Sequence, residues 1–309
     1  MKKEILAGIT IVLISFQSYC QTDSLRPVSG DTLRKEGFPE APGYAGQEKK
    51  SVNKKTTLYK INPAVDIPIV VAGTGWSLFT FTKIYDKGVT SEEKILGLKK
   101  SDINAFDRWA VYPYSKTLDR VSYYPFYAAI PLPLIFFATD KEVRKDYWKL
   151  TFLYWEAMAV TGLMGTTATY FVDRYRPYAY SNETPMPKRM DRISKNSFYS
   201  GHVQIVSVST FFIAKVYSDY HPESKIKWVY YGVAAAATGA TAYMRLAGGQ
   251  HFPSDILLGT ALGTLTGIMV PQLHKIKNPS MSVLPYNNGE SQGITFTYHF
   301  HDIHKKIKS

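Results

Sequence analysis

Residues 245–255 read RLAGGQHFPSD and separate the last two apolar stretches of the chain. Pro253 suits the first turn of a helix, so we expect a helix to begin beside it. His251 then lies at the helix entry, where free backbone N–H groups and the helix dipole favour an anion. Arg245 adds a planar fork of N–H donors that matches phosphate oxygens.

Asp255 follows His251 by four residues, which is close to one helical turn. Its carboxylate can accept a hydrogen bond from one ring nitrogen of His251. The other nitrogen then keeps a lone pair in a fixed orientation and can act as a nucleophile. A histidine beside an apolar helix is more often structural, so the spacing to Arg245 and Asp255 is what indicates catalysis.

A second polar cluster, formed by Ser200, Gly201 and His202, opens the fourth apolar stretch. Glycine lets the backbone approach an oxyanion closely, and the serine hydroxyl and helix-start amides can donate to it. We expect His202 to be the general acid that protonates a leaving oxygen.

A third cluster, formed by Arg174 and Arg176, closes the third apolar stretch just before Pro177. Guanidinium groups beyond an apolar helix are costly in lipid but suit an anion site. We expect both arginines to bind phosphate, although an interfacial anchor explains Arg174 equally well.

Apolar stretches long enough for helices of about 20 residues dominate the chain. They comprise residues 66–84, 121–139, 150–172, 199–217, 227–245 and 255–273. We predict an all-α six-helix bundle embedded in a membrane. The mean hydropathy of −0.17 is low for a protein with six spans, so a soluble helical bundle remains the alternative.

An up-down bundle brings all three polar clusters to one end. Separately, Ser101 to Trp109 is predicted to form a short amphipathic helix.

The ends of the chain have a different character. Lys2 and Lys3 precede a short apolar run, which predicts a signal peptide, and the sole cysteine, Cys20, lies at the expected cleavage site. Alternating apolar residues around Asn287-Asn288-Gly289 predict a β-hairpin. The predicted organisation is a signal peptide at 1–20, a disordered polar tail at 21–60, a helical domain at 61–277, and a hairpin with a basic tail at 278–309.

The three polar clusters together resemble the signature of the type 2 phosphatidic acid phosphatase and vanadium haloperoxidase superfamily. That signature is a lysine, six residues and Arg-Pro; then Pro-Ser-Gly-His; then Ser-Arg, five residues, a histidine, three residues and an aspartate. The resemblance covers about residues 120–275. The matching residues are Arg176, Pro177, Ser200, Gly201, His202, Arg245, His251 and Asp255.

The chain departs from this signature at three positions. Thr169 stands where the lysine is expected, Tyr199 replaces the proline, and Met244 replaces the serine. The missing lysine removes one cation from the expected phosphate site. Arg174 is one candidate to replace it, and the others are Lys188, Arg189, Arg192 and Lys195.

The resemblance implies a phosphohistidine mechanism on the catalytic residues His251, His202 and Asp255. His251 attacks phosphorus, His202 protonates the leaving oxygen, and Asp255 holds His251. The phosphate-binding residues are then Arg174, Arg176, Ser200, Gly201 and Arg245. No metal or other cofactor is implied, and no metal-binding cluster is evident in the sequence. Glu156, within an apolar stretch, is either functional or faces a polar groove.

The formal net charge of +12, from 37 basic and 25 acidic residues, suits an anionic partner. No nucleic-acid-binding motif is present, and no obligate protein partner is evident. We therefore expect a phosphatase of a lipid phosphomonoester or pyrophosphate, exported to the cell envelope with its active site facing the periplasm. The alternatives are a soluble periplasmic acid phosphatase, a vanadate-dependent haloperoxidase, and an inactive envelope protein.

Overall fold

The computed structural model describes residues 57–276, 281–287 and 292–298. The predicted signal peptide and almost all of the predicted polar tail lie outside these residues. The last part of the tail does not match its prediction. Tyr59 is fully buried, and its backbone pairs with Lys275. Residues 57–60 therefore belong to the packed helical part of the chain and not to the predicted disordered tail.

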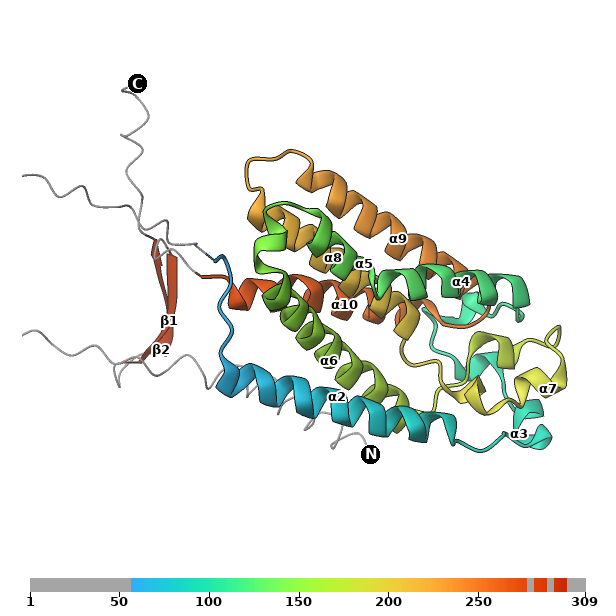
Figure 1. Ribbon diagram of the computed structural model, residues 1–309. Coiled ribbons are helices and arrows are strands. Elements are labelled where there is room, and N and C mark those ends of the chain that lie inside the picture. The colour runs from blue at the N-terminus through green and yellow to red at the C-terminus, as the bar shows by residue number, and fades with distance from the viewer. Residues whose placement is uncertain (1–56, 277–280, 288–291, 299–309) are drawn as a thin grey trace, which may run out of the picture. The chain divides into compact units, whose positions relative to one another are not determined.

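Helices account for most of the described chain (Figure 1). The long ones are α2 (Pro63–Tyr85), α4 (Lys116–Ala129), α5 (Leu132–Thr139), α6 (Tyr147–Phe171), α8 (Gly201–Tyr220), α9 (Lys227–Ala247) and α10 (Pro253–His274). Two short helices are α3 (Glu92–Leu96) and α7 (Met186–Arg189). Short 3₁₀ turns occupy Lys100–Asp102, Arg108–Ala110, Val143–Asp146, Pro177–Tyr180 and Arg192–Lys195.

These helices coincide with the predicted apolar stretches, with one exception. The stretch at residues 121–139 is divided between α4 and α5, with Ile130 and Pro131 between them. Proline has no N–H and its ring clashes with the preceding turn. Pro131 and Pro133 therefore explain why the second stretch is two helices rather than one.

Helix α8 is the central element, and it contacts α4, α5, α6, α9 and α10. Its contact with α10 is close because α10 presents a glycine every fourth residue. A Cβ at Gly259, Gly263 or Gly267 would lie 2.5–2.7 Å from backbone carbonyl oxygens of Ser200, Gln204 or Val208, respectively. Only glycine permits this approach, which sets the first turns of α8 and α10 side by side.

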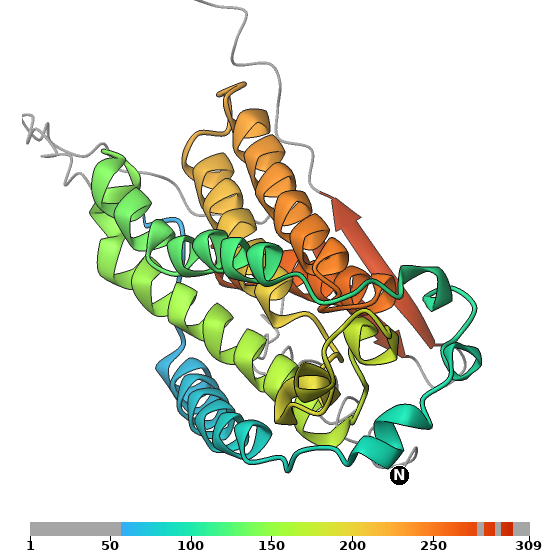
Figure 2. The same cartoon turned by 90° about the vertical axis from the view of Figure 1, so that its right-hand side faces the viewer.

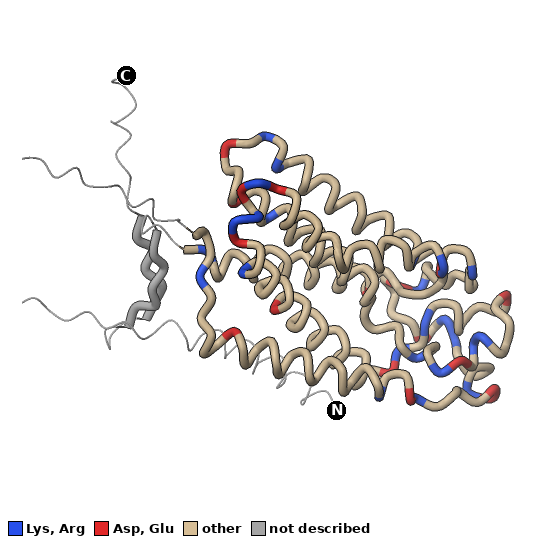
Figure 3. Tube along the Cα trace, viewed as in Figure 1, with Lys and Arg blue, Asp and Glu red and all other residues tan. Residues whose placement is uncertain are grey.

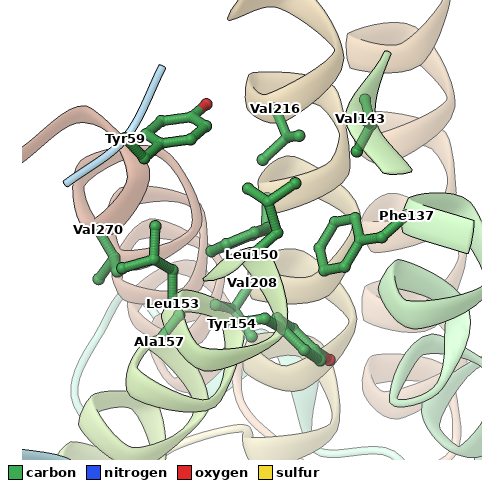
Figure 4. Packing of buried hydrophobic residues seen from close by; sticks show 11 residues of the cluster. Tyr59, Phe137, Val143, Leu150, Leu153, Tyr154, Ala157, Val208, Val216 and Val270 are labelled. Carbon is green, nitrogen blue, oxygen red and sulfur yellow. The ribbon is translucent and has the colours of Figure 1, made fainter. Parts of the chain in front are cut away.

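The hydrophobic core joins α5, α6, α8 and α10 near the ends remote from those first turns. Figure 4 shows its packing, with the ring of Tyr59 covering the cluster from the N-terminal segment. Helix α2 packs on α6 at the periphery of the bundle (Figure 2). Phe137, Leu150, Leu153 and Phe212 are fully buried in this core.

The outer surface of the bundle is apolar over long distances. Within the described residues, three helical segments are long and apolar enough to cross a membrane: Pro63–Tyr85, Lys116–Thr139 and Pro253–His274. Charged residues gather towards the two ends of the bundle and are sparse along the helices between them (Figure 3). Leu78 and Trp228 are among many large apolar side chains that remain exposed. These features support membrane association.

Strands β1 (Met281–Asn287) and β2 (Gln292–Tyr298) pair antiparallel, from Met281 opposite Tyr298 to Asn287 opposite Gln292. The connection between them, which contains most of the predicted Asn-Asn-Gly turn, lies outside the described residues.

Candidate active site

The three polar clusters of the sequence meet at one end of the helices. Arg176 follows α6, Ser200 precedes α8, and Arg245 lies in the last turn of α9. The backbone N–H of Ser200 donates to the carbonyl of Asp255 at 3.2 Å. The side chains of Arg176 and Arg245 both donate to the amide oxygen of Gln250.

His251 is 2% exposed, and its Nδ1 lies 2.7 Å from the carbonyl oxygen of Ser197. A carbonyl oxygen only accepts hydrogen bonds, so Nδ1 carries the proton and Nε2 keeps the lone pair. The prediction that His251 donates to Asp255 is therefore wrong, because Nδ1 donates to the Ser197 carbonyl instead. The ring has the expected fixed tautomer, but a backbone carbonyl sets it.

Asp255 acts on His251 through an intermediate residue, Ser197. Its Oδ2 accepts hydrogen bonds from the Ser197 hydroxyl at 2.6 Å and from the Phe252 N–H at 3.0 Å. The second contact caps the start of α10. Asp255 therefore holds Ser197, and the carbonyl of Ser197 holds His251.

Burial lowers the pKa of His251 well below the ordinary value for histidine, and the positive charges of Arg176 and Arg245 lower it further. The hydrogen bond to Ser197 opposes this effect but does not cancel it. The imidazole is therefore neutral at neutral pH, as a nucleophile must be.

Ser200 and His202 lie at the start of α8 and are directed into the interior. Ser200 is fully buried. The His202 ring packs against Tyr123 and Phe126 of α4, each with a centroid separation of 4.5 Å. A Cβ at Gly201 would meet nothing within 4 Å, so open space lies beside its backbone. Gly201 therefore lies beside open space and not at a close packing contact.

Arg245 and Arg176 differ in how their charge is balanced. Arg245 is 1% exposed, and its Nη1 donates to Asp119 at 2.7 Å and to Ser122 at 2.9 Å. Arg176 donates to Gln250 and to the carbonyl of Asn196. Within residues 57–276 no carboxylate pairs with Arg176. Its positive charge remains available to an anion.

Several buried polar side-chain atoms of this site have no hydrogen-bond partner in the described part of the chain. They are Arg176 Nε, Ser200 Oγ, His202 Nε2, Arg245 Nε and Gln250 Nε2. A buried polar group left unpaired costs about 1–3 kcal/mol. An anion with several acceptor oxygens would satisfy such donors, and phosphate fits this description.

Arg174 does not match its prediction as a phosphate ligand. Its guanidinium donates to Asp107 at 2.7 Å and also to Asp255, and it lies 4.6 Å from the centroid of the Phe252 ring. Two carboxylates neutralise its charge, so an additional anion would gain little there. Arg174 instead ties Asp107 to the first turn of α10.

Asp107 is a residue of this site that sequence reasoning missed. It is fully buried and accepts from the backbone N–H of Ser254 at 2.9 Å and from its hydroxyl at 2.6 Å. Burial raises the pKa of Asp107, but the hydrogen bonds from Ser254 and Asn104 outweigh it and hold that pKa below its usual range. The predicted helix at residues 101–109 is also wrong, because 3₁₀ turns there present Asp107 inward.

Thr169, at the position of the signature lysine, donates to the carbonyl of Phe198 at 3.1 Å. The ammonium of Lys87 lies beside it, 2.7 Å from the Thr169 carbonyl and 2.7 Å from Asp173. No pattern in the sequence pointed to Lys87.

The other residues suggested as replacements for the signature lysine bond elsewhere: Lys188 to Asp191, Arg189 to the Ala179 carbonyl, and Arg192 to the Tyr85 carbonyl. For Lys195 the structure gives no side-chain contact to the site.

Residues 150–279 match the model of the PAP2 superfamily. This part of the chain resembles the PAP2 superfamily. The matched range contains every catalytic and phosphate-binding residue predicted from the sequence, whereas α2, α4 and α5 precede it. No curated protein matches the chain.

Among solved structures, the chain is similar to the first transmembrane PAP2 type phosphatidylglycerolphosphate phosphatase from Bacillus subtilis. The identity is 22%, the TM-score is 0.42, and the match covers 69% of this chain and 99% of that one.

Proposed function

We propose that the chain is a metal-independent phosphatase of the PAP2 type that hydrolyses a lipid phosphomonoester or pyrophosphate through a phosphohistidine at His251. The observation that carries this proposal is the neutral His251 ring among buried donors that lack partners. A fixed lone pair beside convergent donors is the arrangement that nucleophilic phosphoryl transfer requires.

In the first step, Nε2 of His251 attacks phosphorus and the bond from phosphorus to the leaving oxygen breaks. The oxygens of the transferred group gain charge, and donors from Arg176, Arg245 and Ser200 stabilise it. Open space lies beside the backbone of Gly201, so its amide can add a further donor.

His202 supplies the proton for the leaving oxygen. Its Nε2 is buried and without a partner in the described residues. When the ring carries a proton on both nitrogens, it can pass the Nε2 proton to the leaving alcohol or phosphate and become neutral. In the second step water attacks the phosphohistidine, His202 takes the proton back, and the bond between nitrogen and phosphorus breaks.

The position of the site supports a lipid substrate. The site lies where α6 and α9 end and α8 and α10 begin, next to helical segments apolar enough to cross a membrane. A phosphorylated headgroup at the membrane surface would reach this end without leaving the bilayer. We further propose that residues 61–277 form the catalytic domain, that residues 1–20 direct export, and that the site faces the periplasm.

The test is phosphate release by the detergent-purified protein on a panel of lipid phosphates and soluble phosphate esters, with a chelator present. His251→Ala is compared with His221→Ala, because His221 lies at the far end of α8 and pairs with Asp140. We expect release on lipid phosphates that is lost only in His251→Ala. Equal activity of wild type and His251→Ala would contradict the mechanism, and preference for soluble esters would favour an acid phosphatase.

A further inference from the structure

Asp66, Glu156 and His274 form a second cluster of titratable side chains, from α2, α6 and α10. Both carboxylates are 4% exposed, and the His274 side chain is 11% exposed. Nε2 of His274 lies 3.2 Å from Asp66 Oδ2 and 3.4 Å from Glu156 Oε2. One ligand-type atom from each residue lies within 4.8 Å of the other two.

This cluster is separate from the proposed active site. His251 directly precedes the first turn of α10, whereas His274 is its last residue. A helix of 22 residues is roughly 33 Å long at about 1.5 Å per residue. The two sites therefore lie at opposite ends of α10, and the proposed phosphatase mechanism does not use this cluster.

The tautomer of His274 prepares it to bind a cation. Its Nδ1 lies 2.8 Å from the carbonyl oxygen of Val270, which can only accept, so Nδ1 carries the proton. When Nε2 carries no proton, its lone pair is directed at the two carboxylates. Metal-binding histidines are commonly oriented by this kind of hydrogen bond from the other ring nitrogen.

Glu156 gives an independent reason to expect a ligand. Its Oε2 is buried and has no hydrogen-bond partner among the described residues. From the described part of the chain, Asp66 Oδ2 accepts one N–H, that of Asn62, at 2.6 Å. Two buried carboxylates facing a nitrogen lone pair form an all-acceptor cluster, which is costly without a positive ion between them.

The geometry fits a small divalent ion. Zinc bonds of about 2.0–2.2 Å in a tetrahedral site place neighbouring ligand atoms roughly 3.4 Å apart. The observed 3.2 and 3.4 Å match this separation. One imidazole nitrogen with two carboxylate oxygens suits zinc or a similar transition metal, whereas magnesium and calcium prefer oxygen ligands only.

We propose that Asp66, Glu156 and His274 bind one divalent transition-metal ion, best matched by zinc, which joins α2, α6 and α10. The N-terminal segment is attached at the same place. Lys60 N–H donates to the His274 carbonyl at 2.8 Å, and Ile276 N–H donates to the Leu58 carbonyl at 2.8 Å. A bound ion fastens this segment and the peripheral helix α2 to the end of α10.

The experiment uses the full chain in detergent, dialysed against chelator and then titrated with Zn²⁺, Mn²⁺ or Mg²⁺. We expect one zinc per chain by elemental analysis. We also expect a melting temperature higher by roughly 5–10 °C when free zinc is 100-fold above its Kd, and little response to Mg²⁺. Co²⁺ in place of zinc would give the visible absorption of a tetrahedral site in the wild-type protein, whether or not any variant folds.

Glu156→Gln removes one ligand charge at nearly constant volume, and we expect it to lower zinc affinity at least tenfold. Glu142→Gln is the control, because Glu142 is exposed and pairs only with Lys145. Equal zinc binding in Glu156→Gln and wild type would refute the proposal. Wild-type protein that takes up no metal would refute it as well. Phosphate release is measured separately in chelator, so failure here leaves the proposed phosphatase unaffected.

Discussion

At the scale of single residues, the orientation of His251 depends on a relay that begins at Asp255. The carboxylate holds the Ser197 hydroxyl, and the Ser197 carbonyl holds the ring. The sequence predicted the residues at both ends of this relay. It could not predict Ser197, because the contact joins residues 54 positions apart and serines in loops carry no distinguishing pattern.

The relay predicts that Ser197→Ala lowers kcat several-fold with little change in KM. The carbonyl remains, but the loop loses its bond to Asp255, so the ring is held less firmly. Ser194→Ala is a matched control, because the Ser194 hydroxyl is equally buried and has no hydrogen-bond partner in the described residues. Steady-state kinetics on the preferred lipid phosphate checks this, and equal kcat values for both variants would refute the relay.

The lowered pKa of His251 predicts the pH dependence of stability. In the unfolded chain this histidine takes up a proton as pH falls below about 6.5, whereas the folded protein takes it up only at much lower pH. The free energy of unfolding contributed by His251 is therefore present above pH 6.5 and is lost as pH falls towards the folded pKa.

Denaturant unfolding of wild type and His251→Gln at pH 7 and pH 5 measures this contribution. We expect wild type to lose more stability than the variant on acidification. An identical loss in both proteins would mean that the ring is protonated in the folded state.

At the scale of helices, the apolar stretches predicted α2, α6, α8, α9 and α10 well because their residues stay uncharged over a helix length. Prolines explain the division of α4 from α5. The loops were predicted poorly. Residues 101–109 carry a helical pattern but are shaped by Asp107, whose partners Arg174 and Ser254 are distant in sequence.

The glycines of α10 predict a sharp difference between two Gly→Ala substitutions. A Cβ at Gly263 would lie 2.5 Å from the Gln204 carbonyl, whereas a Cβ at Gly239 of α9 meets nothing within 4 Å. We expect Gly263→Ala to destabilise by about 1–3 kcal/mol through overpacking. Gly239→Ala should be neutral or slightly stabilising, because alanine favours helix. Thermal unfolding in detergent distinguishes them, and equal melting temperatures would contradict the close packing.

At the scale of the whole molecule, the sequence predicted where the polar clusters would meet but not how the far end is built. Asp66, Glu156 and His274 are single polar residues on three helices. Each is separated from the next by about 90 or more residues, so no spacing pattern connects them. Only the packing of α2 and α10 on α6 brings them together.

The apolar outer surface predicts that a charge on α2 impairs membrane insertion. Leu78 is 65% exposed on a segment apolar enough to cross a membrane. Lysine at the centre of such a helix costs about 2.5–3.5 kcal/mol on insertion. We expect Leu78→Lys to reduce the fraction of protein that stays in membranes after alkaline carbonate extraction, and Leu78→Ala to retain it. Full retention of Leu78→Lys would argue that α2 does not contact lipid.

The glycine contacts between α8 and α10 also bear on how the protein can change over generations. Backbone atoms, rather than side chains, fix the separation of these two helices. Ser200 and His251 stand at their adjoining ends, so these backbone contacts, rather than the apolar side chains of the bundle, set the distance across the proposed site. We therefore expect that core and lipid-facing side chains can be exchanged with little effect on the geometry of the proposed site, provided that these three glycines persist.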